Sequence, residues 1–313
     1  MLAVALLMAS VDQTIVATAL PQVQRDLGAE ANAAGWIITA YTLGLVLMLP
    51  VAGTLGDRYG RKSVFLVAAA VFTAASLACG LVHDLEVLVV LRFVQAIGGG
   101  ALMPSATGIV VATFGEERDK ALGAFSSVFP IGGIVGPLLG GVIVHWLSWR
   151  WIFLVNIPLG IGLIVAGAVF VPRIEERRDD DRFDLLGIAM LMGALLAFMM
   201  GVSLMSGVDD RPFGLAVLVL SACATCAFFR HTRLRSSFLP RELLVGSRFA
   251  VMNVINFLYG SVALGLGVLI PHYAHNRFGM GSLEGGSLMT LRAVGAVIAA
   301  IVAIVLLRRF GYR

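Results

Sequence analysis

Long runs of apolar residues, separated by short polar segments, follow one another along the whole chain. A helix needs about 20 mostly apolar residues to cross the hydrocarbon core of a bilayer. Ten runs meet this requirement, at residues 2–21, 34–53, 63–82, 86–110, 121–145, 151–171, 185–206, 212–229, 249–271 and 286–307. The pattern predicts an all-α membrane protein with about ten transmembrane helices.

The composition supports this class of protein. Of the 313 residues, 59% are hydrophobic and only 13% are charged, whereas a soluble domain carries about 25% charged residues. The net charge of +4 does not indicate a nucleic-acid partner, because the basic residues lie in short segments between the apolar runs. Three cysteines make no disulfide framework, and we interpret Cys223 and Cys226, on one face of an apolar run, as packing residues.

The distribution of Lys and Arg predicts the orientation in the membrane, because these residues accumulate in cytoplasmic loops. With a cytoplasmic N-terminus, 17 of the 23 basic residues lie in inner segments, and only Arg25, Arg150, Arg211 and Arg277 lie in outer ones. Both ends of a ten-helix chain are then expected in the cytoplasm of the cell, with the protein in the plasma membrane.

Two charged segments divide the apolar runs into groups. Residues 172–183 mix both charge signs, and residues 231–248 are basic. The basic segment is either a solvated loop or a contact with anionic lipid headgroups. The expected order is a six-helix bundle at 1–171, a cytoplasmic linker at 172–183, two extra helices at 184–230, a basic linker at 231–248 and the start of a second bundle at 249–313.

The loop after the second run carries a specific pattern of glycines and charges. It reads Gly53-Thr-Leu-Gly-Asp57-Arg58-Tyr-Gly60-Arg61-Lys62. This resembles the G-x-L-x-D-R-x-G-R-K signature of the major facilitator superfamily of secondary transporters, with Gly56 where the family often has Ala. The resemblance implies a conformational latch formed by Gly53, Asp57, Arg58, Gly60 and Arg61.

Glycines recur in the fifth run. Three of them, Gly132, Gly136 and Gly140, are spaced by four residues and share one helix face, which lets another helix approach closely. The full pattern resembles the antiporter motif of the proton-coupled exporters of this superfamily. The motif comprises Gly123, Gly132, Gly136, Pro137, Gly140 and Gly141.

Two ionisable residues lie inside apolar runs of the first half. Asp12 and Arg92 are costly to bury, which makes them candidates for function, although Arg92 could instead snorkel to the outer interface. At about 1.5 Å per residue, they lie roughly 13 Å and roughly 9 Å below the outer ends of their helices, so that they can meet. Burial favours a neutral carboxyl group and a neighbouring arginine favours a carboxylate. We hypothesise that Asp12 binds a proton from outside and releases it inside.

Further resemblances connect these residues to one branch of the superfamily. The segment Asp12–Pro21 resembles the D-x-T-I-V-x-x-A-L-P motif of the fourteen-helix drug:proton antiporters, and Trp149–Gly160 resembles their W-R-W-I-F-x-x-N-x-P-x-G stretch. The segment Arg92–Gly98 resembles the R-x-x-Q-G-x-G motif, which links Arg92 to proton transfer. We expect Trp149 and Trp151 at the outer interface.

Two more polar residues are candidates for a substrate cavity, namely Gln95 and Arg292. Arg292 can instead pair with a helix end. The last residues, Arg308–Arg313, resemble residues 57–62 without the acidic residue. In the family four helices follow this position, so we expect the chain to be C-terminally truncated, with an incomplete second bundle.

The sequence thus predicts a monomeric, proton-coupled exporter of small amphipathic compounds or drugs. Its expected partners are protons, a small-molecule substrate and the lipid bilayer, and no enzyme activity, cofactor or metal is expected. Nutrient uptake by the same fold and an inactive truncated remnant remain alternatives. A membrane sensor or intramembrane enzyme is disfavoured, because neither an output domain nor clustered catalytic residues are recognisable.

Overall fold

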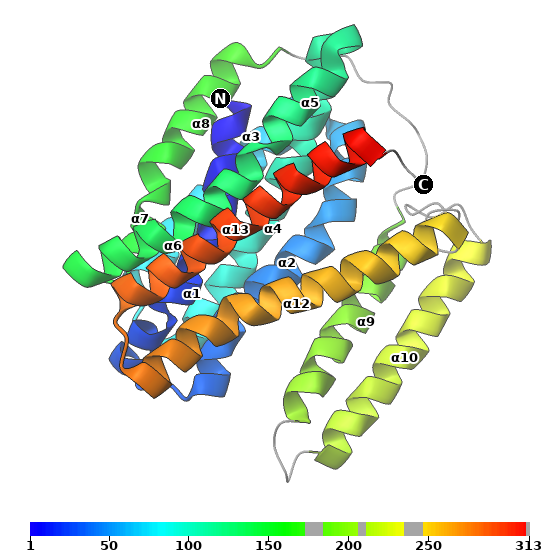
Figure 1. Cartoon of the computed structure of the whole chain (residues 1–313). Helices are drawn as coiled ribbons and strands as arrows, with labels where there is room; N and C mark the ends of the chain where they lie inside the picture. The colour runs from blue at the N-terminus through cyan, green and yellow to red at the C-terminus, as the bar shows by residue number, and fades with distance from the viewer. Residues whose placement is uncertain (173–183, 206–210, 235–246, 311–313) are drawn as a thin grey trace.

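The chain is described by a computed structural model that covers residues 1–172, 184–205, 211–234 and 247–310. Its described residues form α-helices, one short 3-10 helix and connecting turns (Figure 1). The elements are α1 (Leu2–Asp26), α2 (Ala31–Tyr59), α3 (Arg61–Leu81), α4 (Leu85–Phe114), η1 (Gly115–Glu117), α5 (Arg118–Ser126), α6 (Val128–Trp146), α7 (Trp151–Leu154), α8 (Asn156–Phe170), α9 (Leu185–Leu204), α10 (Arg211–Leu234), α12 (Ser247–Phe278) and α13 (Ser282–Phe310). The predicted all-α membrane fold is confirmed.

The number of membrane crossings depends on how the helices are counted. Seven helical stretches of the described residues are long and apolar enough to span a bilayer, and up to eight if the bent helix α2 is one span. One of the seven is the run Leu85–Trp146, which contains both α4 and α6. Eight of the ten predicted runs each coincide with one helix, two are each divided between two helices, and the count of ten crossings stays a prediction.

Three predicted runs depart from single straight helices. The predicted run 121–145 is divided into α5 and α6, and the run 151–171 into α7 and α8. Pro130 and Pro158 lie in the first turns of α6 and α8, where a missing amide hydrogen is tolerated. Helix α2 bends by 46° between Ala33–Leu49 and Val51–Tyr59.

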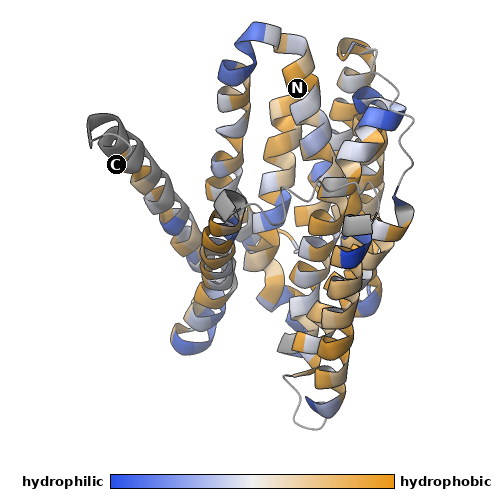
Figure 2. Cartoon of the chain, turned by 90° about the vertical axis from the view of Figure 1, so that its right-hand side faces the viewer, coloured by the Kyte–Doolittle hydropathy of each residue, from blue (hydrophilic) through white to orange (hydrophobic). Residues whose placement is uncertain are grey.

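Helices α1 to α8 gather into one bundle, beside which α9 and α10 form a hairpin, while α12 and α13 run across the bundle (Figure 1). Apolar residues cover the long middle parts of the helices, and polar residues concentrate near their ends (Figure 2). This distribution fits helices whose middle parts lie in hydrocarbon. Exposed Cys223 and Cys226 do not pack inside the chain as expected, but lie on the outer surface of α10.

The bundle contains two separate apolar clusters. One includes Leu6, Phe65, Phe72 and Leu102, and the other includes Ile15, Ile37, Leu88 and Phe153. Trp149, which is predicted at the outer interface, lies between α6 and α7 beside the end of α1, and its depth in the membrane stays a prediction. Its side chain is fully buried in the second cluster, and its indole Nε1 donates a hydrogen bond of 3.0 Å to Asp26 Oδ2.

Parts of the predicted domain boundaries lie outside the described residues. These are positions 173–183 of the first linker, 235–246 of the basic linker and 311–313 of the C-terminal repeat. Helix α10 continues to Leu234, four residues beyond the predicted end of the extra helices at 230.

Candidate functional site

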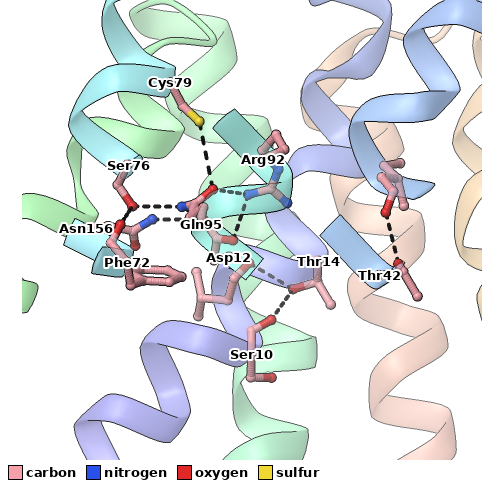
Figure 3. A network of polar contacts seen from close by, with 12 residues as sticks. Ser10, Asp12, Thr14, Thr42, Phe72, Ser76, Cys79, Arg92, Gln95 and Asn156 are labelled. Atoms are coloured by element: carbon pink, nitrogen blue, oxygen red, sulfur yellow. Dashed lines mark hydrogen bonds and ion pairs between the residues drawn. The ribbon is translucent and has the colours of Figure 1, made fainter. Parts of the chain in front are cut away.

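A layer of polar side chains crosses the bundle between the two apolar clusters. Helices α1, α3 and α4 each have buried residues in both clusters, and α8 has one in the first cluster. Helix α1 supplies Asp12, α3 supplies Ser76, α4 supplies Arg92 and Gln95, and α8 supplies Asn156. These side chains point toward one another in the interior (Figure 3). The apolar clusters on either side separate this layer from both ends of the bundle.

The carboxylate of Asp12 is the centre of this layer. Its side chain has no exposed surface and accepts hydrogen bonds from three donors. Arg92 Nη1 lies 2.8 Å from Oδ2, while Gln95 Nε2 and Asn156 Nδ2 lie 3.0 Å and 2.9 Å from Oδ1. The predicted meeting of Asp12 and Arg92 is therefore present as a buried ion pair.

Gln95 connects Arg92 to helix α3. Its Oε1 accepts a hydrogen bond of 2.5 Å from Arg92 Nη1, and its Nε2 donates a bond of 2.7 Å to Ser76 Oγ. Ser76 in turn donates to the Phe72 carbonyl oxygen, 2.8 Å away. We expected Gln95 on a substrate cavity, but it is fully buried in this network, because it lies on the same face of α4 as Arg92, one turn later.

Aromatic rings enclose the Arg92 guanidinium. Its Cζ lies 3.9 Å from the centroid of the Tyr41 ring and 5.4 Å from that of Phe153. Arg92 is only 1% exposed, so it does not snorkel to the interface. A buried cation that lost its carboxylate would be strongly destabilising, and the position of Arg92 therefore depends on the charge of Asp12.

The other face of α1 packs against the glycines of α6. Three hydroxyl-bearing residues, Ser10, Thr14 and Thr18, face Gly132, Gly136 and Gly140 in the same order. Ser10 Oγ donates a hydrogen bond of 2.7 Å to the Phe129 carbonyl oxygen. A methyl group on Gly132 would lie 2.5 Å from Ser10 Cβ, so only glycine allows this approach.

The remaining residues of the antiporter motif occupy two different environments. Pro137 and Gly141 face α13, where Gly286 packs against the backbone of both. Thr290 Oγ1 on α13 lies 3.2 Å from the Ile134 carbonyl oxygen of α6. Gly123, by contrast, is exposed on the separate helix α5 and a methyl group there would contact nothing within 4 Å. Helix α6 is therefore packed between α1 and α13.

The latch loop joins α2 to α3 through Gly60, whose φ of 86° is unfavourable for residues with a side chain. Arg61 Nη2 lies 3.4 Å from Asp57 Oδ1, and Arg61 Nη1 donates a bond of 3.0 Å to the Gly108 carbonyl oxygen of α4. Lys62 Nζ donates to the carbonyl oxygens of Ala168 and Val171 at the end of α8. The loop thus contacts α4 and α8.

The other latch residues make fewer contacts. Arg58 stacks near Tyr59, with 5.6 Å between its Cζ and the ring centroid. Gly53 lies within α2, and a methyl group there would contact nothing within 4 Å.

The other cavity candidate, Arg292, is exposed on α13. Its Nη1 donates a hydrogen bond of 3.3 Å to the Ala263 carbonyl oxygen of α12. Within the described ranges, no group of three or more His, Cys, Asp or Glu side chains could hold a metal ion.

Sequence reasoning did not assign a role to Asn156, Ser76 or Tyr41. Asn156 was visible as an amide within the W-R-W-I-F-x-x-N stretch, and its polarity inside an apolar run was a usable signal. Ser76 and Tyr41 gave no such signal, because serine and tyrosine are common in membrane helices without a specific partner.

Comparisons with known proteins agree with this architecture. The family model described as Major Facilitator Superfamily matches residues 2–313. The "Multidrug transporter protein MdtP" of Bacillus subtilis (strain 168) is 29% identical over 320 residues, which is 100% of this chain and 58% of that protein. The "Tetracenomycin C resistance and export protein" of Streptomyces glaucescens is 32% identical over 321 residues, which is 99% of this chain and 58% of that protein. The chain therefore spans a little over half the length of these curated relatives.

Solved structures support the fold. The crystal structure of an auto-inhibited POT family peptide transporter matches with a TM-score of 0.62 at 15% identity, over 100% of this chain and 70% of that chain. The crystal structure of a D-xylose-proton symporter matches with a TM-score of 0.62 at 13% identity, over 98% of this chain and 68% of that chain.

Proposed function

Because the chain belongs to the major facilitator superfamily, a family of multi-pass membrane transporters for small molecules, we propose that it is a proton-coupled exporter. The proposed substrates are small amphipathic compounds, including drugs. The names of two relatives, a multidrug transporter and a tetracenomycin C resistance and export protein, support this class of substrate.

The observation that carries the proposal is the buried Asp12 carboxylate with its three hydrogen-bond donors. A carboxyl group in the membrane interior can carry a proton if its neighbours can respond to the change of charge. Arg92 is such a neighbour, because it contacts both Asp12 and Gln95 through the same Nη1 atom. The pair is the proposed proton-coupling site.

The mechanism follows from the ion pair. When Asp12 is charged, it attracts Arg92 and fixes α1 against α4. When a proton neutralises Asp12, this attraction is lost, and Arg92 retains only Gln95 and the aromatic rings. The relative position of α1 and α4 can then change, which couples proton binding to the exposure of the substrate site. A ligand shifts a two-state equilibrium only if it binds the two states differently, and the proton does so through Arg92.

The glycine face of α6 supports export over uptake. The resemblance of this face to the antiporter motif is the sequence argument, and the close contacts on two sides of α6 are compatible with it. Since α6 touches both α1 and α13, a movement of α1 would be transmitted toward the second group of helices.

We further propose that the latch residues Asp57, Arg58 and Arg61 hold one conformation at the cytoplasmic side. Arg61 links Asp57 to the backbone of α4, and separation of these helices would break that contact. The proposed orientation places both chain ends in the cytoplasm. The proposed units are α1 to α8, then α9 with α10, then α12 with α13.

Transport in inverted membrane vesicles tests the proposal. The vesicles contain the chain and an acidic lumen, and an amphipathic fluorescent cation such as ethidium is added. The unaltered chain should accumulate the dye and raise the luminal pH at the same time. Asp12→Asn should abolish both signals, because the amide cannot carry a proton, while Glu117→Gln on the exposed 3-10 helix η1 serves as the matched control.

Two results would contradict the proposal. Full dye-dependent proton movement in Asp12→Asn would show that Asp12 is not the carrier. Dye movement by the unaltered chain that is unaffected when the proton gradient is dissipated would show that transport is not proton-coupled.

A further inference from the structure

Tyr41 on α2 lies directly beside the proton-coupling site. The residue is 1% exposed, and its ring covers the Arg92 guanidinium at 3.9 Å. Both Asp12 and Arg92 are within electrostatic range of its hydroxyl group. The hydroxyl group lies close enough to Asp12 for a side-chain hydrogen-bond interaction, although it makes no hydrogen bond of ordinary geometry with any described residue.

A nitrogen atom of Arg92 also lacks a hydrogen-bond partner within the part of the chain that the structure describes. Arg92 Nε is buried and has no hydrogen-bond partner among the described residues. Buried polar groups are normally paired, because an unpaired group loses its water without compensation. Tyr41 and Arg92 Nε therefore have hydrogen-bonding capacity that the present arrangement of described residues does not use.

The protonated state of Asp12 has a requirement that the charged state lacks. A carboxylic acid is a hydrogen-bond donor and needs an acceptor. The three present partners of Asp12 are N–H donors, from Arg92, Gln95 and Asn156. The oxygen of Gln95 already accepts from Arg92, and Ser76 Oγ already accepts from Gln95. The hydroxyl oxygen of Tyr41 is a buried acceptor at this site that receives no hydrogen bond from a described residue.

We propose that Tyr41 is a positioning residue whose hydroxyl oxygen accepts a hydrogen bond from the neutral Asp12 carboxylic acid when Arg92 moves away. This inference rests on the proposed proton-coupling role of Asp12. The proton stays covalently bound to Asp12, and no covalent bond to Tyr41 is formed or broken. The titratable and charged side chains around Asp12 are Tyr41 on α2, Cys79 on α3 and Arg92 on α4, while α8 presents the neutral Asn156 and α6 presents glycines.

Infrared difference spectroscopy on the purified chain in lipid tests this inference, because the C=O stretch of a carboxylic acid reports both its protonation and its hydrogen bond. A pH titration should show a carboxylic-acid band that is absent in Asp12→Asn. In Tyr41→Phe, which removes only the hydroxyl, the band should move to higher frequency. Tyr59→Phe, at the exposed end of α2, is the matched control.

A second measurement needs no substitution at the site. With ring-labelled tyrosine in the unaltered chain, a phenol C–O band should shift over the same pH range as the Asp12 band. An Asp12 band with unchanged frequency in Tyr41→Phe would overturn the role of Tyr41 alone. A titration in which the unaltered chain shows no band that depends on Asp12 would instead overturn the proposed proton-coupling role.

Discussion

At the scale of single residues, the Asp12 carboxylate is held entirely inside the protein by hydrogen-bond donors from other helices, including Arg92. The carboxylate has three donors, and none of the groups involved is accessible to solvent beyond 2% of its surface. In such surroundings the two members of an ion pair depend on each other, because removal of one leaves a buried charge without compensation. The cost of that unpaired charge makes the site responsive to one proton.

This dependence can be measured in a double-mutant cycle. Arg92→Met alone should lower the free energy of unfolding by about 3–5 kcal/mol, because it leaves the Asp12 charge unpaired. The double variant Asp12→Leu with Arg92→Met should cost clearly less than the sum of the two single variants. The measurement is reversible unfolding in mixed detergent micelles.

The exposed pair of Arg118 and Asp119, separated by 3.8 Å on α5, provides the comparison. Arg118→Met should change the stability by less than about 1 kcal/mol, since surface ion pairs contribute little. Additive costs for Asp12 and Arg92 would mean that the two charges are not coupled in the folded protein.

At the scale of helices, the contact between α1 and α6 shows how a repeated spacing in one helix requires a matching spacing in another. Gly132, Gly136 and Gly140 are effective only because Ser10, Thr14 and Thr18 follow the same four-residue repeat on α1. Small residues let the two backbones approach, and close packing is a main source of helix association in membranes. The same helix α1 carries Asp12 on a different face, so this contact positions the polar layer.

A methyl group at the centre of this contact should disturb it. At Gly136 the added Cβ would collide with the Thr14 hydroxyl and lie 3.1 Å from the Val11 carbonyl oxygen. Gly136→Ala should therefore cost about 1–3 kcal/mol of folding free energy, as for other overpacked sites. Gly133→Ala on the same helix is the matched control, because its Cβ would contact nothing within 4 Å.

A second substitution should compensate for the loss of stability in Gly136→Ala. Thr14→Ala removes the colliding hydroxyl and should restore part of the stability lost in Gly136→Ala. Equal stability losses in Gly136→Ala and Gly133→Ala would show that the effect comes from helix propensity and not from the contact.

The sequence predicts the helices well and the site only in part. Long apolar runs predict where the helices lie, because a segment in lipid must satisfy its own backbone hydrogen bonds. The depth estimate for Asp12 and Arg92 predicted their meeting, because helical rise is constant. Asn156 and Tyr41 could not be placed, since their contacts depend on how α8 and α2 rotate in the bundle. The burial of Gln95 and Trp149 was not predicted, for the same reason. A cavity role for Gln95 stays a prediction.

At the scale of the whole molecule, the polar layer lies between two apolar clusters that belong to the same bundle. One cluster includes the latch side, with Val64 and Phe65 near Arg61, and the other includes the opposite side, with Leu88 and Trp149. A proton that reaches Asp12 must therefore pass one cluster to enter and the other to leave. Alternation between the two sides requires a defined orientation of the chain in the membrane.

The orientation gives the last prediction. Two exposed positions are predicted on opposite sides of the membrane. Asp119 on α5 is predicted on the cytoplasmic side, and His83, between α3 and α4, is predicted on the outer side. In a background that lacks Cys79, Cys223 and Cys226, a membrane-impermeant maleimide should label Asp119→Cys only in inverted vesicles. The same reagent should label His83→Cys only in right-side-out vesicles. Permeabilised vesicles, where both positions should react, control for reactivity. Because the excess of inner Lys and Arg is large, a mixed result is not expected, and labelling with the opposite sidedness would reverse the direction in which Asp12 is proposed to carry its proton.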